Sequence, residues 1–353
     1  MSESSREWGK FRPALQPLPD IDLAKLVEIL QQRGFHATEA QEAAELIRDR
    51  DAWYYRIQFP PDLWTTTFRF ESVAITRTLL SRAGLRGASV LDIGTMEGMI
   101  PMLARAAGAN RVVGYDRLRN GRNRVALVQR VYGREFEHST GQSLADFRRQ
   151  SDEQFDVVVF SGVLCHMFDP LGGLALAASF AKPGGLLIFE SSAIVREDCA
   201  LHFNRRGRYY PEANFFQPTA EALDHFFRFI GLAAIDGEYF IQRTFPAPLI
   251  RIGVTCRVTA KPLPSPGDSW MKQGFEVDFG EFRLGRRNKN IEVPDLIKYV
   301  GIDRSKAVDP QTGTMNIPWF IERYPALRIS AAMTELSLAA AAVSNPPAAS
   351  VPL

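Results

Sequence analysis

The chain has 353 residues, of which 46% are hydrophobic and 23% charged, an ordinary globular composition that allows a sizeable core. Lys and Arg total 42 against 40 Asp and Glu, and a formal net charge of +2 excludes a broad positive field for nucleic acid or an anionic membrane. The three cysteines, Cys165, Cys199 and Cys256, are far apart and lack CxxC spacing, which argues against a disulfide framework and a structural zinc site.

The amino-terminal end carries no sign of a targeting segment. Its sequence, MSESSREWGKFRP, lacks the apolar core of a signal peptide. No stretch reaches the roughly 20 apolar residues that a membrane span needs. We therefore expect a cytoplasmic protein with reduced thiols, no membrane association and no bound metal.

Two short amphipathic helices are predicted next. The first covers residues 21–33 and is capped by Asp20, and the second covers residues 40–48. Thr38 followed three residues later by Gln41 fits a capping box at the start of the second helix. The aromatic stretch that follows, DAWYYRIQFPPDLWTTTFRF, is too rich in proline for a long helix and too apolar for a solvated linker, so we expect it to lie against the next domain.

From about residue 69 the pattern changes to short apolar runs that alternate with helix-length segments. This alternation is typical of an α/β fold in which helices wrap a parallel sheet. Seven strands are predicted, and the last two form a hairpin: residues 89–93, 111–115, 135–139, 155–160, 186–190, 233–241 and 250–260.

The composition also predicts the domain organisation. A PLPSPG stretch reads as a linker after the last predicted strand, and the end of the chain is rich in Ala and Pro. We predict a helical and aromatic cap, a catalytic domain, an extension or lid, and a tail that is partly disordered, over residues 1–68, 69–261, 262–330 and 331–353.

The strongest motif is SVLDIGTMEGMIPMLARAAGANRVVGYD. An apolar strand runs into Asp92, a loop carries Gly94 and Gly98, and a second strand ends in Asp116. Glycines allow the backbone to approach a ligand closely, and an acid at the end of the second strand can accept hydrogen bonds from both ribose hydroxyls. Dinucleotide-binding enzymes share this acid, but their G-x-G-x-x-G loop holds a pyrophosphate. Here Glu97 stands where phosphate would lie, which disfavours an anion and not a cationic sulfonium.

This motif resembles that of class I S-adenosylmethionine-dependent methyltransferases, although Met96 replaces its middle glycine. The strand QFDVVVFSGVLCH, with Asp156 at its start, and the KPGG turn before LLIFE lie where that family has its fourth strand and the turn into its fifth. The resemblance implies a Rossmann-like seven-stranded methyltransferase sheet with a helical N-terminal addition and a C-terminal extension. It also implies S-adenosyl-L-methionine as cofactor, bound by Asp92, Gly94, Thr95, Glu97, Gly98, Asp116, Arg117, Ser143, Leu144, Ser161 and Gly162.

Within that superfamily, GVLCHMFDPLGGL, IFESS and RYYPEANFFQPTAEALDHFFRFIGL look like the bacterial tRNA wobble-uridine carboxymethyltransferase group. That group binds a carboxylated cofactor with a tyrosine and basic partners. Here Cys165 occupies the tyrosine position, and Met167 and Phe168 stand where arginines are expected. We therefore predict ordinary methyl transfer to a small molecule, a reaction that would suit specialised metabolism. The Arg-rich stretches NRRGR and RLGRRNK keep a tRNA substrate as the alternative, unless they are solvated loops.

Two residues are candidates for the chemistry. His166 follows the fourth predicted strand, and an imidazole with a pKa near ~6.5 can accept a proton from the acceptor, unless it only caps a helix or packs. Glu190 ends the fifth predicted strand and would serve as a base or hold a cationic nitrogen. Structural pairing with Arg208 or Arg205 is the alternative.

Aromatic and basic residues outside the sheet are candidates for binding the acceptor: Trp53, Tyr54, Arg208, Tyr209 and Trp319. Aromatic clusters also form ordinary cores. The sequence is compatible with a homodimer built through the N-terminal helices or the C-terminal extension. It is also compatible with a domain that binds the cofactor only to regulate a partner.

Overall fold

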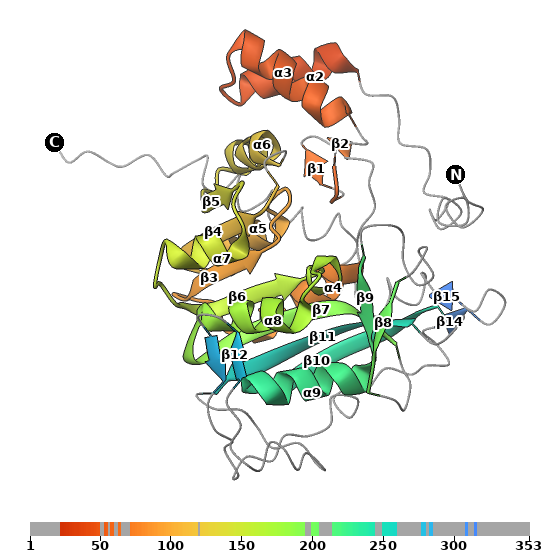
Figure 1. The fold of residues 1–353 in the computed structure, drawn as a ribbon. Helices are drawn as coiled ribbons and strands as arrows, with labels where there is room; N and C mark the ends of the chain where they lie inside the picture. Colours follow the sequence, from red (N-terminus) through yellow and green to blue (C-terminus); the bar gives the residue numbers. More distant parts are fainter. Residues whose placement is uncertain are drawn as a thin grey trace.

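The structure, a computed structural model, describes residues 22–49, 53–55, 57–59, 63–64, 71–118, 121–194, 199–204, 214–243 and 249–259, and the short strands at 277–279, 282–284, 308–309 and 314–315. Most of them form one α/β domain with a central sheet, and a helical pair stands at one edge (Figure 1). No helix in these ranges is long and apolar enough to cross a membrane.

The central sheet contains all seven predicted strands, and the Rossmann-like fold is confirmed. They are β3 (Ser89–Ile93), β4 (Arg111–Asp116), β5 (Glu137–Thr140), β6 (Phe155–Ser161), β7 (Ala181–Ile194), β10 (Leu232–Arg243) and β11 (Leu249–Val258). The sheet order is β14-β15-β10-β11-β7-β6-β3-β4-β5, with two short outer strands, β14 (Val308–Asp309) and β15 (Thr314–Met315), beyond the predicted seven.

Strand direction follows from the connections. The pairs from β7 to β5 are all parallel, because a helix crosses between successive strands, whereas β10 and β11 form the predicted antiparallel hairpin. The carboxyl ends of β3, β4, β6 and β7 therefore meet along one edge, where ligands bind in open α/β sheets.

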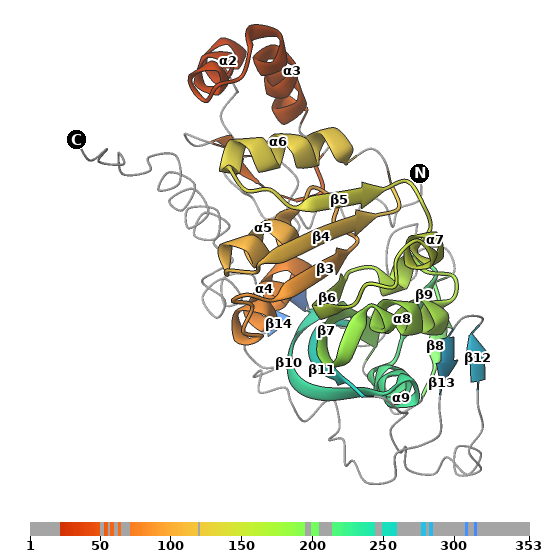
Figure 2. The same ribbon diagram turned by 90° about the vertical axis from the view of Figure 1, so that its left-hand side faces the viewer.

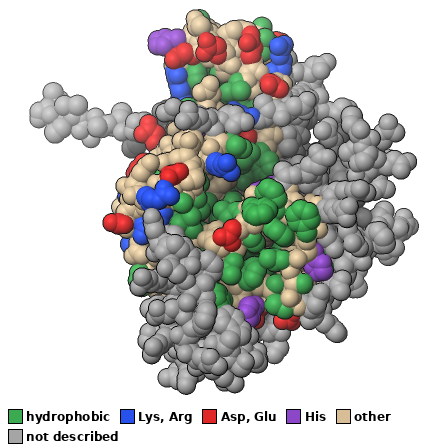
Figure 3. All heavy atoms as spheres, viewed as in Figure 1, with side chains coloured by type: hydrophobic (Ala, Val, Ile, Leu, Met, Phe, Trp, Pro, Cys, Tyr) green, Lys and Arg blue, Asp and Glu red, His purple; other side chains and the backbone are tan. Residues whose placement is uncertain are grey.

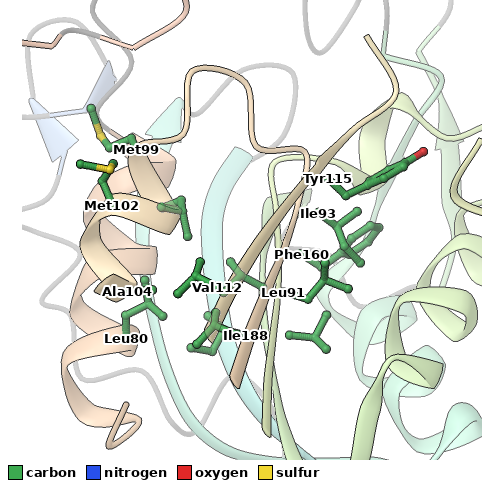
Figure 4. Close-up of a cluster of buried hydrophobic side chains, with 14 of the residues drawn as sticks. Leu80, Leu91, Ile93, Met99, Met102, Ala104, Val112, Tyr115, Phe160 and Ile188 are labelled. Atoms are coloured by element: carbon green, nitrogen blue, oxygen red, sulfur yellow. The ribbon is translucent and has the colours of Figure 1, made fainter. Parts of the chain in front are cut away.

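Helices cover both faces of the sheet (Figure 2). On one face lie α4 (Glu71–Arg82) and α5 (Met99–Ala106), and on the other lie α8 (Pro170–Ser179) and α9 (Ala220–Ile230). Helix α5 packs onto β3 and β4, and α4 packs onto β7 and β11, and their side chains join one hydrophobic core (Figure 4). The remaining helices are α6 (Arg122–Tyr132), α7 (Leu144–Arg149) and the short η2 (Leu164–His166).

The strand β7 is longer than predicted at both ends. The KPGG turn lies within it: Phe155 pairs with Ala181, and the next pair, after a register shift, joins Val157 to Leu186. Gly184 supplies the positive φ, 79°, that this detour needs. Beyond Glu190 the strand continues because β11 pairs with it as far as Ile194.

Both N-terminal helices are confirmed, but their caps differ from the prediction. Helix α2 (Leu23–Gln32) is capped by Asp22 rather than Asp20. Helix α3 (Ala37–Arg48) starts one turn early, because the Glu39 carboxylate accepts the backbone N–H of His36 at 3.1 Å, and Thr38 and Gln41 lie inside the helix. The observed capping box lies two residues before the predicted one and satisfies the His36 N–H instead of that of Thr38.

The helical pair docks on α6 through Arg33 and Arg130. Arg33 donates to the Val131 carbonyl at 3.2 Å, and Arg130 donates to Glu39 at 3.1 Å while its guanidinium stacks 3.8 Å over the Phe35 ring. The aromatic stretch that follows α3 packs against the domain as predicted, with Trp53, Tyr55, Ile57 and Phe59 all buried. Short strands β1 (Gln58–Phe59) and β2 (Leu63–Trp64) lie within this stretch.

Candidate functional site

The loop between β3 and α5 begins with a turn that only glycine fits. At Gly94 the backbone has a φ of 91°, and a Cβ atom there would stand 2.5 Å from Val163 Cγ2. The N–H groups of Gly94 and Thr95 both donate to the carbonyl of Tyr115, at 2.8 and 3.0 Å. The loop is therefore fastened to the end of β4 and lies directly against the loop that follows β6.

Asp116 ends β4, and two backbone N–H groups hold its carboxylate in place. Oδ2 accepts from Met96 at 2.9 Å, and Oδ1 accepts from Leu118 at 2.8 Å. Met96 has a φ of 50°, which explains why the resembled motif has glycine here, and the bond to Asp116 stabilises this left-handed backbone. Each carboxylate oxygen keeps capacity for a further donor, such as a ribose hydroxyl.

Asp92 lies beneath the same loop and is fully buried. Its Oδ2 accepts the hydroxyl of Thr95 at 2.7 Å. Burial raises the pKa of Asp92 to about 7, the Thr95 hydrogen bond opposes this shift, and the charge of Asp116 adds to it. A buried acid that is half ionised at neutral pH responds strongly to any positive charge placed nearby.

Glu97 is buried and turns towards the N-terminal segment. Oε1 accepts the backbone N–H of Tyr54 at 2.8 Å, and Oε2 accepts that of Tyr55 at 3.3 Å. Arg124, on α6, approaches Oε1 with Nε at 3.9 Å. Burial raises the pKa of Glu97, while the Tyr54 N–H and Arg124 oppose that shift.

Trp53 is packed inside the N-terminal addition rather than exposed to a cleft. Its indole N–H donates to the Leu46 carbonyl at 2.9 Å, and its ring stands edge-on to Phe59 at 5.5 Å between centroids. The ring is fully buried, so the predicted contact with substrate does not fit its position. Tyr54 is half-buried beside the loop.

A small pocket of about 20 Å³ lies beside Asp116 and is lined by Met96, Glu97, Asp116, Leu118, Gly121 and Arg124. It is far smaller than the roughly 300 Å³ of a complete ligand site, so on its own it could border only a small part of a cofactor. Backbone approaches closely here, since a Cβ on Gly121 would stand 2.8 Å from the Met96 carbonyl. The pocket lining contains two acids and one arginine, and this charge balance suits the paired hydroxyls of a ribose better than a pyrophosphate. It agrees with a nucleoside that carries a sulfonium.

Ser143 and Leu144 lie one strand away from Asp116, at the start of α7. The Ser143 hydroxyl is used as the helix N-cap, accepting the Asp146 N–H at 3.0 Å, and Leu144 is buried. The loop is tied to β4 by the Tyr115 hydroxyl, which donates to the Gln142 carbonyl at 2.7 Å. Leu144 and this loop, more than the Ser143 hydroxyl, can border an adenine. Arg117 is exposed.

A buried polar network links the carboxyl ends of β6 and β7 to the amino end of β11. Ser161 Oγ lies 2.8 Å from the Thr76 hydroxyl of α4 and donates to Glu190 Oε2 at 3.2 Å. Arg251 Nε donates to Glu190 Oε1 at 2.6 Å, so among the described residues Arg251 is a cationic partner of this acid. The Gly162 N–H donates to the Glu190 carbonyl at 2.8 Å.

This pairing bears on the proposed roles of Glu190. Both carboxylate oxygens are engaged, and the guanidinium balances the charge, so Glu190 is better suited to holding the strand ends together than to accepting a proton. A signal for the pair was present in the sequence, since Arg251 interrupts the apolar run LIRIGV. Spacing alone could not pair residues so far apart in the chain.

His166 ends η2 and is exposed beyond β6. Cys165 is buried beside it, and its carbonyl accepts the Phe215 N–H at 2.8 Å. This bond ties η2 to the hairpin of β8 (Leu201–Phe203) and β9 (Phe216–Pro218). All three cysteines are free thiols.

An apolar surface surrounds this corner of the molecule (Figure 3). Phe168 is 74% exposed, and Phe203 and Phe215 are also exposed. The Phe168 ring lies 5.7 Å from that of Phe215 and 6.2 Å from that of Phe216, and Phe203 lies 5.5 Å from Phe216. We call these four residues the phenylalanine cluster.

Three predicted substrate residues, Arg208, Tyr209 and Trp319, lie outside the described residues, as does Arg205. Within the ranges that the structure describes, no group of His, Cys, Asp or Glu could hold a metal ion. Asp156 and Lys182 pair at 2.7 Å at the opposite, amino end of the sheet, where Asp156 also accepts the Ser89 N–H. They support the sheet and not the site.

Comparison with known families matches residues 66–235 to the family model described as "Methyltransferase domain". Together with the sheet order and the loop at Asp92 and Asp116, this match, over slightly less than half of the chain, identifies residues 66–235 as a methyltransferase domain.

Among curated proteins, the chain is similar to the tRNA U34 carboxymethyltransferase of Pseudomonas aeruginosa, with 26% identity over 250 residues that cover 66% of this chain and 73% of the relative. It is also similar to the ubiquinone biosynthesis O-methyltransferase of Aromatoleum aromaticum, with 30% identity over 36% of this chain and 56% of the relative. A similar solved structure is 1,6-didemethyltoxoflavin-N1-methyltransferase of Burkholderia thailandensis, with 19% identity and a TM-score of 0.40. The aligned region covers 69% of this chain and 92% of that chain.

Proposed function

We propose that this methyltransferase acts on an uncharged or weakly charged small molecule that enters beside His166. The observation that carries the proposal is the apolar corner beyond β6. The described residues of η2, β8, β9 and the turns that flank them include the phenylalanine cluster and contain no Lys or Arg. An RNA-binding surface needs cations for phosphate, whereas exposed rings suit a modest apolar acceptor.

The bound cofactor supplies an activated methyl group, which leaves its sulfur as the acceptor atom attacks in line. The protein contributes alignment and the exclusion of water. Asp116 would accept hydrogen bonds from the ribose hydroxyls, and the loop at Gly94 would let the backbone approach the methionine portion. Asp92 would balance positive charge on the sulfur from beneath the loop.

When the attacking atom carries a proton, a base must take it. The His166 imidazole is exposed at the entrance and can pass a proton to water. Replacing His166 with Gln should then lower kcat for such an acceptor and leave cofactor affinity unchanged. Glu190 would keep the ends of β6, β7 and β11 together through Ser161 and Arg251.

The test uses the purified full chain and cofactor labelled in its methyl group. Label should appear in the small-molecule fraction of a cell extract and stay out of the tRNA fraction. Asp116→Ala is the matched inactive variant, because it loses the expected ribose contacts. Label in tRNA would overturn the acceptor class, and failure of the wild type to bind S-adenosylhomocysteine by calorimetry would overturn the proposed function itself.

The tRNA reading has one observation in its favour, the similarity to proteins named tRNA U34 carboxymethyltransferase over two thirds of the chain. Arg205, Arg206 and Arg208 lie in the sequence between β8 and β9, outside the described residues. If these residues grip RNA, binding of total tRNA should weaken steeply as salt rises, because counterions compete for phosphate.

A further inference from the structure

The side chain of Glu97 belongs to the cofactor loop but is bonded to a different part of the chain. It stands 1% exposed, and its two oxygens accept consecutive backbone N–H groups, from Tyr54 and Tyr55, at 2.8 and 3.3 Å. Hydrogen bonds to an ionised carboxylate are stronger than neutral ones, and a pair of them fixes the position of the segment that donates them. The segment of residues 53–55 is therefore anchored to the loop by one acid.

The anchor continues into the N-terminal helices. Arg124 lies 3.9 Å from Glu97 and places its guanidinium 6.0 Å over the Trp53 ring. Trp53 in turn donates its indole N–H to Leu46, in α3. A continuous set of contacts therefore runs from α3 to the loop after β3.

The same anchor lines the pocket beside Asp116. Glu97 and Arg124 contribute to its wall together with Met96 and Asp116. Tyr55 is buried on the other side of Glu97, and burial raises the pKa of its hydroxyl well above the usual range, reinforced by its electrostatic neighbours Tyr54, Asp92, Glu97 and Glu190. The segment thus lies close to the carboxyl ends of both β3 and β7.

We propose that Glu97 is a positioning residue that holds residues 53–55 behind one wall of the cofactor site, so that docking of the N-terminal helices and binding of the cofactor stabilise each other. The inference rests on the proposed function only in taking the pocket beside Asp116 as the cofactor site. Without the segment, Glu97 would remain as a buried acid with less compensation, which is costly. Coupling between two binding events is reciprocal, so either can be measured through the other.

The test combines calorimetry with hydrogen exchange on the full chain, using S-adenosylhomocysteine as the probe. In the wild type, the probe should slow exchange of the amides of residues 37–59. In Glu97→Gln, which keeps the shape but not the charge, we expect faster exchange at Tyr54 and Tyr55 and about tenfold weaker probe binding. Glu97→Asp should recover part of both.

Glu137→Gln is the matched control, since it removes the same charge from an exposed pair with Arg111 that touches neither the N-terminal helices nor the pocket. It should change probe affinity by less than about twofold. Trp53→Phe tests the coupling with Glu97 intact: it removes the bond to Leu46 and part of the ring that packs against Arg124 and Phe59, and it should weaken probe binding by about fivefold. In both weakened variants KM for the cofactor should rise while KM for the acceptor stays constant.

Two results separate the possible failures. If the wild type binds the probe but exchange in residues 37–59 is unaffected, and Trp53→Phe binds it normally, the coupling is wrong and the proposed function stands. If the wild type does not bind the probe, the proposed function fails first. Should Glu97→Gln not fold, Trp53→Phe alone decides the coupling.

Discussion

The buried carboxyl of Asp92 makes cofactor binding dependent on pH. Its pKa of about 7 means that it is mostly neutral at pH 6 and mostly ionised at pH 8. A cationic sulfonium nearby favours the ionised form, so affinity for S-adenosylmethionine should rise between pH 6 and 8, with proton release on binding. Calorimetry in buffers of different ionisation enthalpy measures both quantities.

The product provides the control for this prediction. S-adenosylhomocysteine lacks the sulfonium charge, so its affinity should change less over the same range. In Asp92→Asn, the affinities for the two ligands should depend on pH in the same way. Equal pH profiles for both ligands in the wild type would contradict a role of Asp92 in balancing the sulfur.

The same group affects stability without ligand. Its folded-state pKa is raised above the ordinary value, so the folded protein binds the extra proton between about pH 4 and 7. Stability from this group is complete below that window and is lost as the pH rises through about 7.

The buried ion pair of Glu190 and Arg251 is the second feature of single residues whose loss can be measured, as a change in the free energy of unfolding. Arg251→Met should leave Glu190 buried without its cation and lower the free energy of unfolding by about 3–5 kcal/mol. The double variant with Glu190→Met should recover most of that loss, because it removes the unpaired charge. Urea denaturation of the three proteins gives the values, and a single variant as stable as the wild type would refute the pairing.

Residue identities could be predicted where they serve the chain locally. Asp116 and Gly94 follow from a strand that ends in an acid and a turn that needs a positive φ. The partners of Glu190 and Glu97 could not be predicted, because Arg251 and the amides of Tyr54 and Tyr55 reach them through the tertiary fold. A sequence shows that an acid is present at a position and not which distant group compensates it.

At the scale of elements, the start of α5 depends on a glycine with two constraints, its backbone conformation and the space around it. Gly98 has a φ of 85°, and a Cβ there would stand 2.5 Å from the buried ring of Phe136. Gly98→Ala should destabilise the protein by about 2–4 kcal/mol, from the left-handed backbone and from overpacking together. Gly133 ends α6 with a φ of 60° and open space around its Cα, so Gly133→Ala should cost only about 1 kcal/mol. Thermal unfolding compares the two, and equal costs would show that the ring moves aside freely.

The strands were predictable because continuous apolar runs are buried on both faces of a parallel sheet. Helix starts were not, since Asp20, Asp22, His36 and Thr38 are all plausible caps and the choice depends on which turn packs on α6. The extension of β7 to Ile194 and the hairpin of β8 and β9 escaped prediction for a similar reason. Their pairing partners, not their own residues, define them as strands.

At the scale of the whole molecule, the edge of the sheet beyond β10 was not predicted from the sequence. The last residue of β10 pairs on its outer side with β15, through Arg243 and Thr314, and β14 lies beyond β15. These two strands begin 50 positions after the end of β11, which pairs with the other side of β10.

A chain cut after residue 307 would uncover the Arg243 end of β10, where unsatisfied backbone groups offer a short open template for another molecule. We expect such a protein to self-associate in proportion to its concentration, measured by sedimentation velocity against the full chain. Equal sedimentation of the two would show that β14 and β15 are dispensable there. If the cut protein does self-associate, then β14 and β15, which take no part in the reaction, keep copies of this enzyme from pairing edge to edge through their sheets.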